Sequence, residues 1–388
     1  MAIARIEVFH VRLPLRWSVG HAAARRQVSE NLFAVVELAD GTTGLGEGLP
    51  RPYVTGETMA GCWRSLERFD LEALVAAWPS LGEIDRLLDV LVAGEKAAPS
   101  ARAALELAML DALGRTTGVS AAALVADLLD MDAPGGREIS YSAVLPFARP
   151  AILRLLCWGA RAYGFTSAKL KVGGPNVEED CRLLEEVRGW LGPDVELRAD
   201  ANGAWSPGDA LTFMEVCPRV RLASLEQPVA PTAWGGLAER LADPPPVSLM
   251  ADEGVCTMED LARLTASKSI QGLNCRIAKM GGLLPAARIG RAAAGLDLLV
   301  GCHVGESTVL SAAGRHLAAL LPEARWFEGS YDRWLLSASI ARKPLGFGRG
   351  GRASVELSPG LGTELRRDVL ERLTLRRMVL WPPRGGGG

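Results

Sequence analysis

Short apolar runs alternate with longer amphipathic stretches through the middle of the chain. Five runs have the length of strands and end in polar or charged residues; they occupy residues 167–172, 196–202, 222–228, 247–253 and 273–279. The stretches between them have the pattern of helices and occupy residues 177–191, 207–217, 232–242 and 258–267. Strands that alternate with helices predict a parallel sheet, so the charged residues at the strand ends should gather in one place.

The strand ends recur at a nearly constant interval, which predicts a closed barrel. Asp200 and Glu226 are 26 residues apart, Glu226 and Asp252 are 26 apart, and Asp252 and Arg276 are 24 apart. Each step fits one strand, one helix and two loops, and in such a barrel the carboxyl ends of the strands form one mouth where catalytic residues lie. Three carboxylates on three neighbouring strands suit a hard divalent cation, Mg²⁺ before Ca²⁺ or Zn²⁺.

The N-terminal third predicts a separate α+β unit. Residues 6–13 and 32–38 read as strands, and Asp40-Gly41 predicts a hairpin turn after the second. The polar segment 17–30 between them predicts a long loop, and such a loop in a compact domain is usually a lid or a binding loop. Helices are predicted at residues 55–76, 83–93 and 100–114, and the other barrel strands at 139–145, 296–302 and 324–328.

Composition narrows the class of protein. With 388 residues and 48% hydrophobic content, the chain can bury a large core in about two domains. A net charge of −2 and the absence of a basic run argue against nucleic acid or an anionic membrane as a partner. Charges interrupt the apolar start of the chain, and no apolar run reaches membrane-spanning length, so we expect a soluble cytoplasmic protein. Seven scattered cysteines without a Cys-x-x-Cys pair argue against a disulfide framework and a structural zinc site.

Four motifs, in their order and spacing, resemble the enolase superfamily, specifically its muconate-lactonizing-enzyme-like branch. They are Lys169-x-Lys171, Asp200-x-Asn202, Glu226-Gln227-Pro228 and Asp252-Glu253. The resemblance covers nearly the whole chain and implies an α/β fold: a TIM-like (β/α)7β barrel with an N-terminal α+β capping domain completed by the C-terminal segment. The implied domains are a capping domain with substrate-specificity loops at 1–135, a barrel with the catalytic and metal site at 136–355, and at 356–388 a return to the capping domain that ends in a frayed, glycine-rich tail.

The resemblance also implies a reaction, in which a proton α to a carboxylate is removed and the resulting enediolate is bound to Mg²⁺, with Mn²⁺ possible. Asp200, Glu226 and Asp252 match the metal ligands, and Lys171 matches the base. Lys169 adds a like charge that should lower the pKa of Lys171, and it can also hold a substrate carboxylate oxygen. The implied partner is a small-molecule carboxylate, and the implied assembly is a homo-oligomer, either a dimer or an octamer.

Further residues receive supporting roles from the same resemblance. Candidates for orienting the ligands or helping at the strand ends are Asn202, Glu253 and Lys279. Candidates for contacting the substrate are Arg25, Tyr53, Glu306 and Glu328. The Asp-x-Asp pattern of the dipeptide epimerases is absent after Glu328, which lowers the expectation of a dipeptide substrate.

The sixth strand departs from the pattern of the branch. Arg276 stands where a lysine usually lies on the opposite face of the substrate, and arginine is hard to deprotonate. Lys279 has the opposite strand parity, so it should not point into the same space. Arg276 therefore favours one-base chemistry, in which the guanidinium holds a carboxylate or an intermediate.

Three functions remain open at this point. The first is cycloisomerisation or β-elimination, as in a dehydratase, with Lys171 as the acid and base. The second is racemisation or epimerisation of an amino-acid derivative, with Arg276 or His303 serving the opposite face; His303 lies where the mandelate-racemase-like branch carries a catalytic histidine. The third is a barrel that binds a carboxylate and a metal without turnover.

Overall fold

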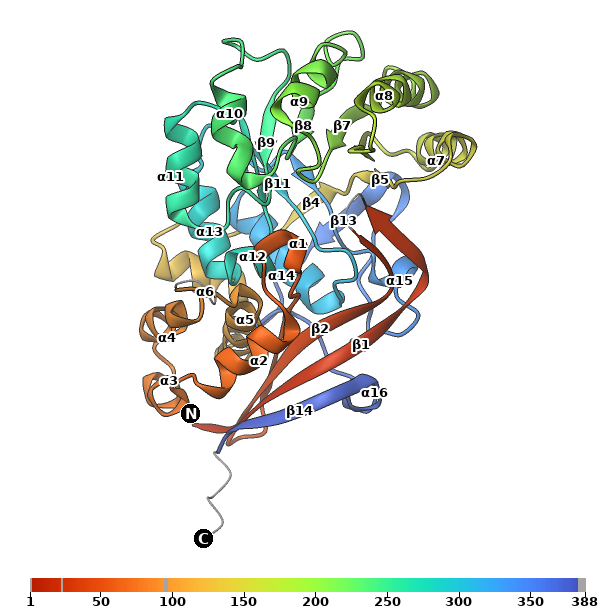
Figure 1. Cartoon of the computed structure of the whole chain (residues 1–388). Helices are drawn as coiled ribbons and strands as arrows, with labels where there is room; N and C mark the ends of the chain where they lie inside the picture. The colour runs from red at the N-terminus through yellow and green to blue at the C-terminus, as the bar shows by residue number, and fades with distance from the viewer. Residues whose placement is uncertain (1, 22–23, 94–96, 383–388) are drawn as a thin grey trace.

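The chain begins and ends in one antiparallel sheet (Figure 1). The computed structural model describes residues 2–21, 24–93 and 97–382, so the tail predicted to fray, residues 383–388, lies outside the described residues. The sheet has the strand order β14-β1-β2-β3. Its strands are β1 (Ile3–His21), β2 (Ala24–Leu38), β3 (Thr43–Gly48) and β14 (Thr374–Trp381). Because β14 pairs with β1, the C-terminal segment completes the N-terminal sheet, as predicted.

The loop predicted at residues 17–30 is strand over its described residues, 17–21 and 24–30, so that prediction is wrong for them. β1 and β2 continue as a paired ribbon, with Val19 opposite Arg26 and Gly20 opposite Arg25. The register shifts between Pro14 and Val19. The pattern of apolar residues could not reveal this ribbon because pairing of the two backbones satisfies the hydrogen bonds without a buried apolar face.

The helices of the N-terminal third lie beside this sheet (Figure 1). They are α1 (Pro52–Thr55), α2 (Met59–Glu67), α3 (Leu71–Ala77), α4 (Leu81–Leu88), η1 (Asp89–Leu91), α5 (Pro99–Thr117) and α6 (Ala121–Leu128). Of these, α5 and α2 pack against the sheet. The predicted helix at 55–76 is interrupted because the side chain of Asp70 caps α3, accepting a hydrogen bond of 3.0 Å from the Ala73 amide. β3 lies directly on α5: a Cβ at Gly46 would come within 1.9 Å of the Ala104 carbonyl oxygen, so glycine is required there.

The barrel is a sheet of eight parallel strands in sequence order. Its strands are β5 (Ala143–Leu145), β6 (Ser167–Lys171), β7 (Glu196–Asp200), β8 (Ser224–Glu226), β9 (Leu249–Ala251), β10 (Gly272–Cys275), β11 (Asp297–Val300) and β12 (Trp326–Phe327). A bridge between Tyr141 and Phe327 closes the sheet. The predicted first strand, 139–145, is divided: its start belongs to β4 (Arg137–Ser140), which pairs with β13 (Arg352–Val355) outside the barrel.

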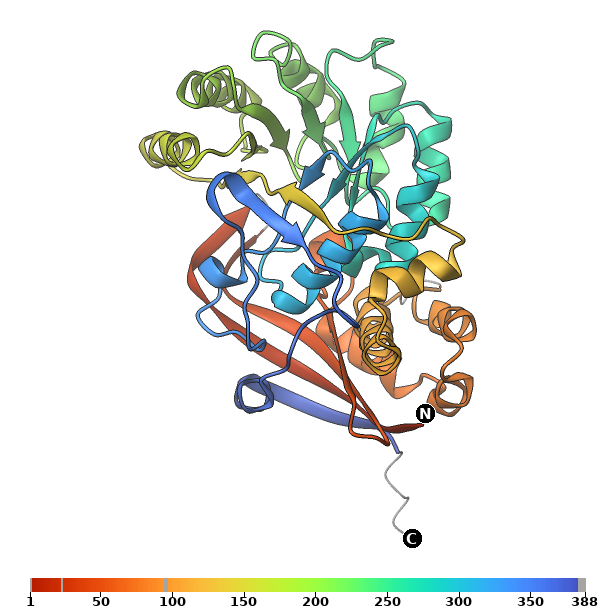
Figure 2. The same cartoon turned by 180° about the vertical axis from the view of Figure 1, so that it is seen from behind.

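The outer layer of the barrel consists of helices, seen from both sides in Figures 1 and 2. They are α7 (Pro150–Tyr163), α8 (Val177–Leu191), α9 (Pro207–Met214), η2 (Pro231–Ala233), α10 (Trp234–Ala238), α11 (Met258–Ala266), α12 (Ile277–Met280), α13 (Leu283–Ala292), α14 (Thr308–Leu320), α15 (Asp332–Leu335) and η3 (Arg349–Gly351). Helix α16 (Arg367–Leu373) instead packs against β1 of the N-terminal sheet, beside β14 (Figure 1). The four helices predicted between the strands are present, and α10 is shorter than predicted because two of its five residues are glycine.

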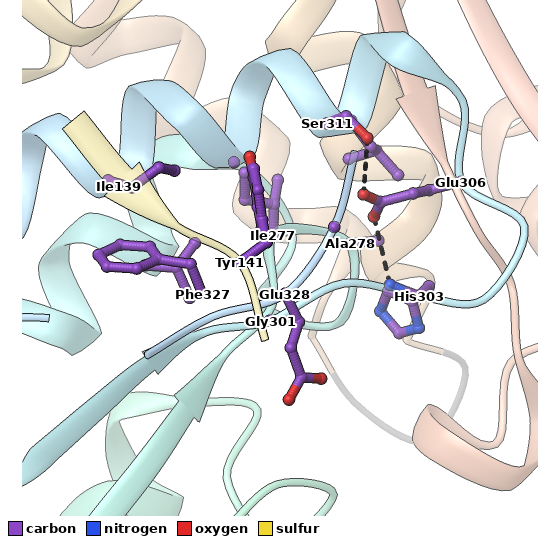
Figure 3. A pocket seen from close by; sticks show the side chains of 14 residues that line it. Ile139, Tyr141, Ile277, Ala278, Gly301, His303, Glu306, Ser311, Phe327 and Glu328 are labelled. Carbon is purple, nitrogen blue, oxygen red and sulfur yellow. Dashed lines mark hydrogen bonds between the residues drawn. The ribbon is translucent and has the colours of Figure 1, made fainter. Parts of the chain in front are cut away.

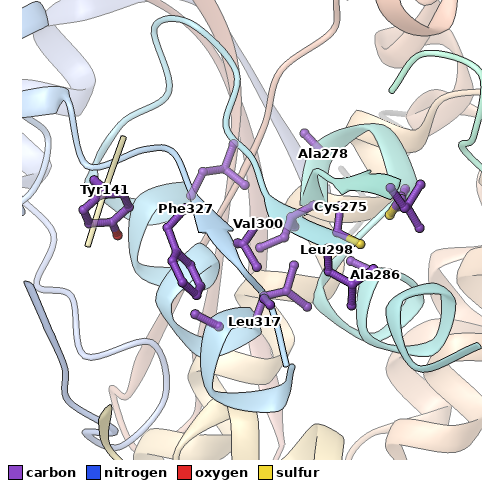
Figure 4. Close-up of a cluster of buried hydrophobic side chains, with 14 of the residues drawn as sticks. Tyr141, Cys275, Ala278, Ala286, Leu298, Val300, Leu317 and Phe327 are labelled. Carbon is purple, nitrogen blue, oxygen red and sulfur yellow. The ribbon is translucent and has the colours of Figure 1, made fainter. Parts of the chain in front are cut away.

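Apolar side chains fill the space between the strands and the helices. Figure 4 shows this packing where Leu298 and Val300 of β11 and Phe327 of β12 meet Leu317 of α14. The fold class inferred from the sequence is thus confirmed, whereas the domain boundaries near residues 135 and 355 stay a prediction. Within the described ranges, no helix combines the length and apolar character needed to cross a membrane.

Candidate active site

The registers of the barrel strands bring the predicted charged residues to one level. Lys171 pairs with Asp200 across β6 and β7, and Asp200 pairs with Glu226 across β7 and β8. Asp252 and Arg276 directly follow β9 and β10. Because the strands are parallel, all these side chains lie at the carboxyl ends of the barrel strands, where the active sites of such barrels form.

Lys169 lies at the centre of a buried group of carboxylates. Its Nζ is 3.0 Å from Glu226 Oε2, 3.3 Å from Asp200 Oδ2 and 2.6 Å from Glu328 Oε2. The residue is only 2% exposed. A lysine held by three carboxylates is tied in place, and its charge is balanced locally. The three carboxylates outweigh burial, which alone would lower it, and so raise the pKa of Lys169.

Lys171 is nearer the surface of the mouth. Its Nζ donates to Asp200 Oδ2 at 2.6 Å and to Asn202 Oδ1 at 2.8 Å. Asn202 adopts a positive φ of 47°, and its Nδ2 donates to Glu253 Oε1 at 3.2 Å. Asn202 therefore links the lysine to Glu253, and its supporting role in the site stays a prediction.

Arg276 faces the same carboxylates from the far side of the barrel. It forms an ion pair with Asp252 and lies 3.4 Å, Nη2 to Oε1, from Glu226. In the sheet order, β6 and β10 are four strands apart in a closed barrel of eight. The two cationic side chains, Lys171 and Arg276, thus approach from opposite sides of the mouth. Burial acts to lower the pKa of Arg276, but attraction by Asp252, Glu226 and Glu253 outweighs it and raises the pKa well above its ordinary value.

The prediction that Lys279 points into a different space from Arg276 is wrong. β10 ends at Cys275, and α12 then begins with Arg276 as its N-cap. The rule of alternating strand faces no longer applies, and two residues three apart on a helix share one side. Lys279 Nζ accordingly lies 3.0 Å from Asp252 Oδ1, so both cations contact the same carboxylate.

The carboxylates differ in how readily they ionise. Burial would raise the pKa of Asp200, but Lys171 and Lys169 hold that pKa below its ordinary value. Lys169 and Arg198 likewise outweigh burial and lower the pKa of Glu328 to about 2. Burial and the neighbouring Asp252 charge raise the pKa of Glu253 to about 8. At neutral pH, Glu253 is therefore mostly protonated and can donate a hydrogen bond.

The donor set fits a hard divalent cation. Asp200, Glu226 and Asp252 are each at most 1% exposed, and carboxylate oxygens are the ligands that Mg²⁺ prefers. In the described part of the chain, the acidic, histidine and cysteine side chains form no group of three already arranged to hold a metal. Lys169 and Arg276 stand between the carboxylates instead. A bound cation would thus replace some of these contacts, and the buried carboxylates provide the charge to hold it.

Figure 3 shows the histidine and the acid predicted at the end of the seventh strand, His303 and Glu306, in one close-up with Glu328. His303 is 4% exposed, and no hydrogen-bond partner for its Nε2 is found among the described residues. Burial and the positive charges of Arg276, Arg51 and Lys279 lower its pKa well below the ordinary value, so the imidazole is neutral. Glu306 accepts hydrogen bonds from Ser311 Oγ at 2.9 Å and from the His303 amide at 3.2 Å.

His303 and Glu306 line a small cavity together with Phe327 and Glu328 from the end of the last barrel strand (Figure 3). Its volume of about 10 Å³ is enough for roughly one water molecule. Glu306 is buried and bonded to Ser311, and its predicted contact with a substrate stays a prediction.

The other predicted substrate contacts are only partly placed by the structure. Tyr53 lies on α1, and the Arg26 guanidinium carbon is 5.3 Å from the centre of its ring. The side chain of Arg25 lies outside the described part of the structure. The carboxylate of Glu328 is held between Lys169 and Arg198 in the barrel interior.

Three polar residues of this site were missed by sequence reasoning. Arg198 Nη2 lies 2.8 Å from Glu328 Oε1, and Asn274 Nδ2 donates to Glu226 Oε1 at 2.6 Å. Gln227 Oε1 accepts from the amides of residues 252 and 254 at 2.9 and 3.0 Å. Strand periodicity could have found two of them, because Arg198 and Asn274 each lie two residues before a predicted site residue.

Comparison with known proteins fixes the family. Residues 4–126 match the N-terminal domain of the mandelate racemase / muconate lactonizing enzyme family, and residues 155–369 match the enolase C-terminal domain-like family. The chain belongs to the enolase superfamily. Within it, the chain falls in the muconate-lactonizing-enzyme-like branch, and it is an enzyme of the isomerase type found among its relatives.

Individual relatives span nearly the full length of the chain. An N-succinyl-L-Arg/Lys racemase from Bacillus cereus is 27% identical over 97% of this chain and 98% of its own. Its crystal structure aligns with a TM-score of 0.86 at 26% identity, covering 98% of this chain and 100% of that one. A hydrophobic dipeptide epimerase from Roseobacter litoralis is 32% identical over 80% of this chain and 84% of its own. A muconate lactonizing enzyme from Pseudomonas fluorescens, complexed with muconolactone, aligns with a TM-score of 0.85 at 25% identity, covering 96% and 99%.

Proposed function

We propose that the chain racemises or epimerises the α-carbon of an N-acylated amino acid in a reaction that depends on Mg²⁺, or on Mn²⁺ in its place. The sequence placed one-base cycloisomerisation or elimination first and this reaction second. The relatives named as a racemase of N-succinyl-amino acids and as a dipeptide epimerase support the second reading better. The predicted small carboxylate partner, the homo-oligomer and the cytoplasmic location stay predictions.

The observation that carries the proposal is the opposed placement of two cationic side chains around three buried carboxylates. Lys171 comes from β6 and Arg276 from the vicinity of β10, four strands away around the barrel. A planar intermediate bound between them would have a side chain able to transfer a proton on each face, and exchange of configuration requires a base on one face and a proton donor on the other. The predicted ligands, Asp200, Glu226 and Asp252, would hold the metal.

Each residue then has a definite task. Lys171 takes the α-proton on one face, held in position by its contacts with Asp200 and Asn202. A bound divalent cation would supply positive charge beside the substrate carboxylate. Lys169, fixed by its three carboxylates, provides a rigidly held positive charge at the floor of the site. On the opposite face, Arg276 holds negative charge and, as a guanidinium, is the group that can give a proton to the intermediate, whereas the neutral His303 can act there only as an acceptor, for a substrate of the other configuration.

The charge state of Arg276 favours a second candidate, one-base cycloisomerisation or β-elimination. Because Asp252 and Glu226 raise the pKa of Arg276, its side chain is rarely neutral and therefore rarely able to accept a proton. In that case Lys171 both removes and returns the proton on one face, and Arg276 is a fixed cation.

Proton NMR in D₂O separates these candidates. The enzyme with Mg²⁺ is given N-succinyl-L-arginine, N-succinyl-L-lysine, dipeptides and muconate-like diacids. Deuterium at Cα in both enantiomers supports racemisation. Exchange with retained configuration, or a cyclic or dehydrated product, supports the one-base candidate. Tight carboxylate binding without exchange for any compound would leave the third reading, a barrel that binds without turnover.

A further inference from the structure

Helix α7 is apolar on two opposite faces. Leu153, Cys157 and Ala160 face the barrel and are buried. The other side is exposed although it too is apolar, with exposed fractions of 51% for Ile152, 67% for Leu155, 38% for Leu156, 52% for Trp158 and 40% for Tyr163. A helix that is apolar all round is normally buried on all sides, so one face of α7 lacks a covering surface within the chain.

The position of α7 leaves this face open. In both views of the whole chain, α7 lies at the outer edge of the barrel beside α8, and no other element lies beyond it (Figures 1 and 2). We define the α7 face as Ile152, Leu155, Leu156, Trp158, Gly159 and Tyr163. Ile152, Leu156, Gly159 and Tyr163 follow one another at intervals of four, three and four positions, which places them along one stripe.

We propose that the α7 face binds the same face of a second copy of this chain across a two-fold axis. This inference is independent of the proposed reaction, and it names a surface for the predicted self-association. Large side chains each present about 150–250 Å² when fully exposed, so the exposed fractions amount to roughly 400–600 Å². Two such faces bury roughly 1,000 Å² before any surrounding residue is counted, which reaches the size expected of a specific interface.

A small residue at the centre allows the helices to approach closely. An added Cβ at Gly159 would meet no atom within 4 Å. Glycine costs a helix roughly 1 kcal/mol relative to alanine, and nothing within the described chain requires it at this position. Close contact with a second α7 would give this glycine a packing role, because small residues let two helix backbones come together.

Charge favours a protein partner over a membrane. Exposed arginines flank the α7 face, at Arg149, Arg154 and Arg161, and α7 contains no acidic residue. The adjacent α8 exposes acidic side chains, at Glu178, Glu179, Glu185 and Glu186. An anionic lipid surface would attract these arginines but repel the acidic side chains of α8 beside them.

Analytical ultracentrifugation of the full-length chain tests the proposal. The wild type should sediment as an oligomer, and Leu155→Arg should weaken association by at least about tenfold at the same protein concentration. Val90→Arg is the matched control, since Val90 is 68% exposed on η1, away from α7, and it should leave association unchanged.

Gly159→Arg shows whether a loss of association is caused by a loss of folding. Arginine is the better helix former, so this variant should keep or raise the melting temperature of the monomer while losing association. The proposal is overturned if the wild type is a monomer, or if both Leu155→Arg and Gly159→Arg associate as the wild type does. It is also overturned if the wild type stays monomeric and instead floats with vesicles of anionic phospholipid.

Discussion

Replacing Arg276 by lysine tests directly whether the side chain opposite Lys171 takes part in proton transfer. The substitution keeps a positive charge near Asp252 and Glu226, which pair with the guanidinium in the wild type. It changes how often the side chain is neutral and able to accept a proton. The surrounding carboxylates raise the pKa of either cation, so the difference in pKa between arginine and lysine at this position should remain close to that of the free groups.

The size of the effect follows from the ordinary pKa values. Near pH 8, a guanidinium with a pKa of about 12.5 is neutral in about 1 molecule in 30,000, and a lysine with a pKa of about 10.4 in about 1 in 250. The ratio is about 100. The neutral guanidine is the stronger base and regains part of this difference, so we expect proton removal on the Arg276 face to become about 10- to 100-fold faster.

The assay is exchange of the α-proton in D₂O in a Lys171→Met background, where exchange by Lys171 is eliminated. Arg276→Met, which cannot take a proton, is the control. We expect the exchange rate to be highest with lysine at position 276 and lower with arginine. With methionine it should be equal to the arginine rate or lower still. If the lysine variant exchanges no faster than the methionine variant, the side chain at position 276 does not reach the α-carbon, and the group on that face lies elsewhere, with His303 the first to examine.

Three further predictions concern single residues. Lys171→Met alone should lower α-proton exchange by 10²- to 10⁴-fold while calorimetry shows unchanged Mg²⁺ affinity; a small effect on exchange would remove Lys171 as the base. Asp252→Asn should weaken Mg²⁺ binding at least about tenfold by calorimetry, and an unaltered affinity would exclude it as a ligand. Burial raises the pKa of Glu47 to about 7 despite its hydrogen bonds to Ser307, so the folded state binds an extra proton between pH 4.5 and 7, and stability falls by about 3 kcal/mol as pH rises through that window. In urea unfolding, the free energy of unfolding of Glu47→Gln should change with pH by about one proton less than that of the wild type. An unchanged slope would contradict the raised pKa of Glu47.

The strand ends were predictable because each carries its own signal. An apolar run followed by a charged residue, repeated at 26, 26 and 24 residues, is enough to place Asp200, Glu226, Asp252 and Arg276 around one mouth. The closed sheet and the registers of the structure confirm that placement. The roles of these residues as ligands or bases stay predictions.

Contacts that depend on tertiary structure carried no such signal. The ion pair between Arg198 and Glu328 joins residues 130 positions apart, and it forms only because β7 and β12 share one barrel interior. Lys279 was misplaced because the chain turns from strand to helix at Arg276, a change that a pattern with period two cannot show. The ribbon at residues 17–30 was missed because neither of its faces is required to be apolar.

The balance of buried charge links the geometry to the chemistry. When Glu253 is protonated and Lys171 is neutral, as a base must be before it takes a proton, the cations and the other carboxylates of the barrel mouth are equal in number. The cations are Lys169, Arg198, Arg276 and Lys279, and the carboxylates are Asp200, Glu226, Asp252 and Glu328. A divalent cation would add two positive charges, and the proton taken by Lys171 would raise the excess to three in a site that excludes most water. Such a site stabilises a doubly negative enediolate more than a singly negative substrate, and this difference between the two states is what accelerates removal of a weakly acidic α-proton.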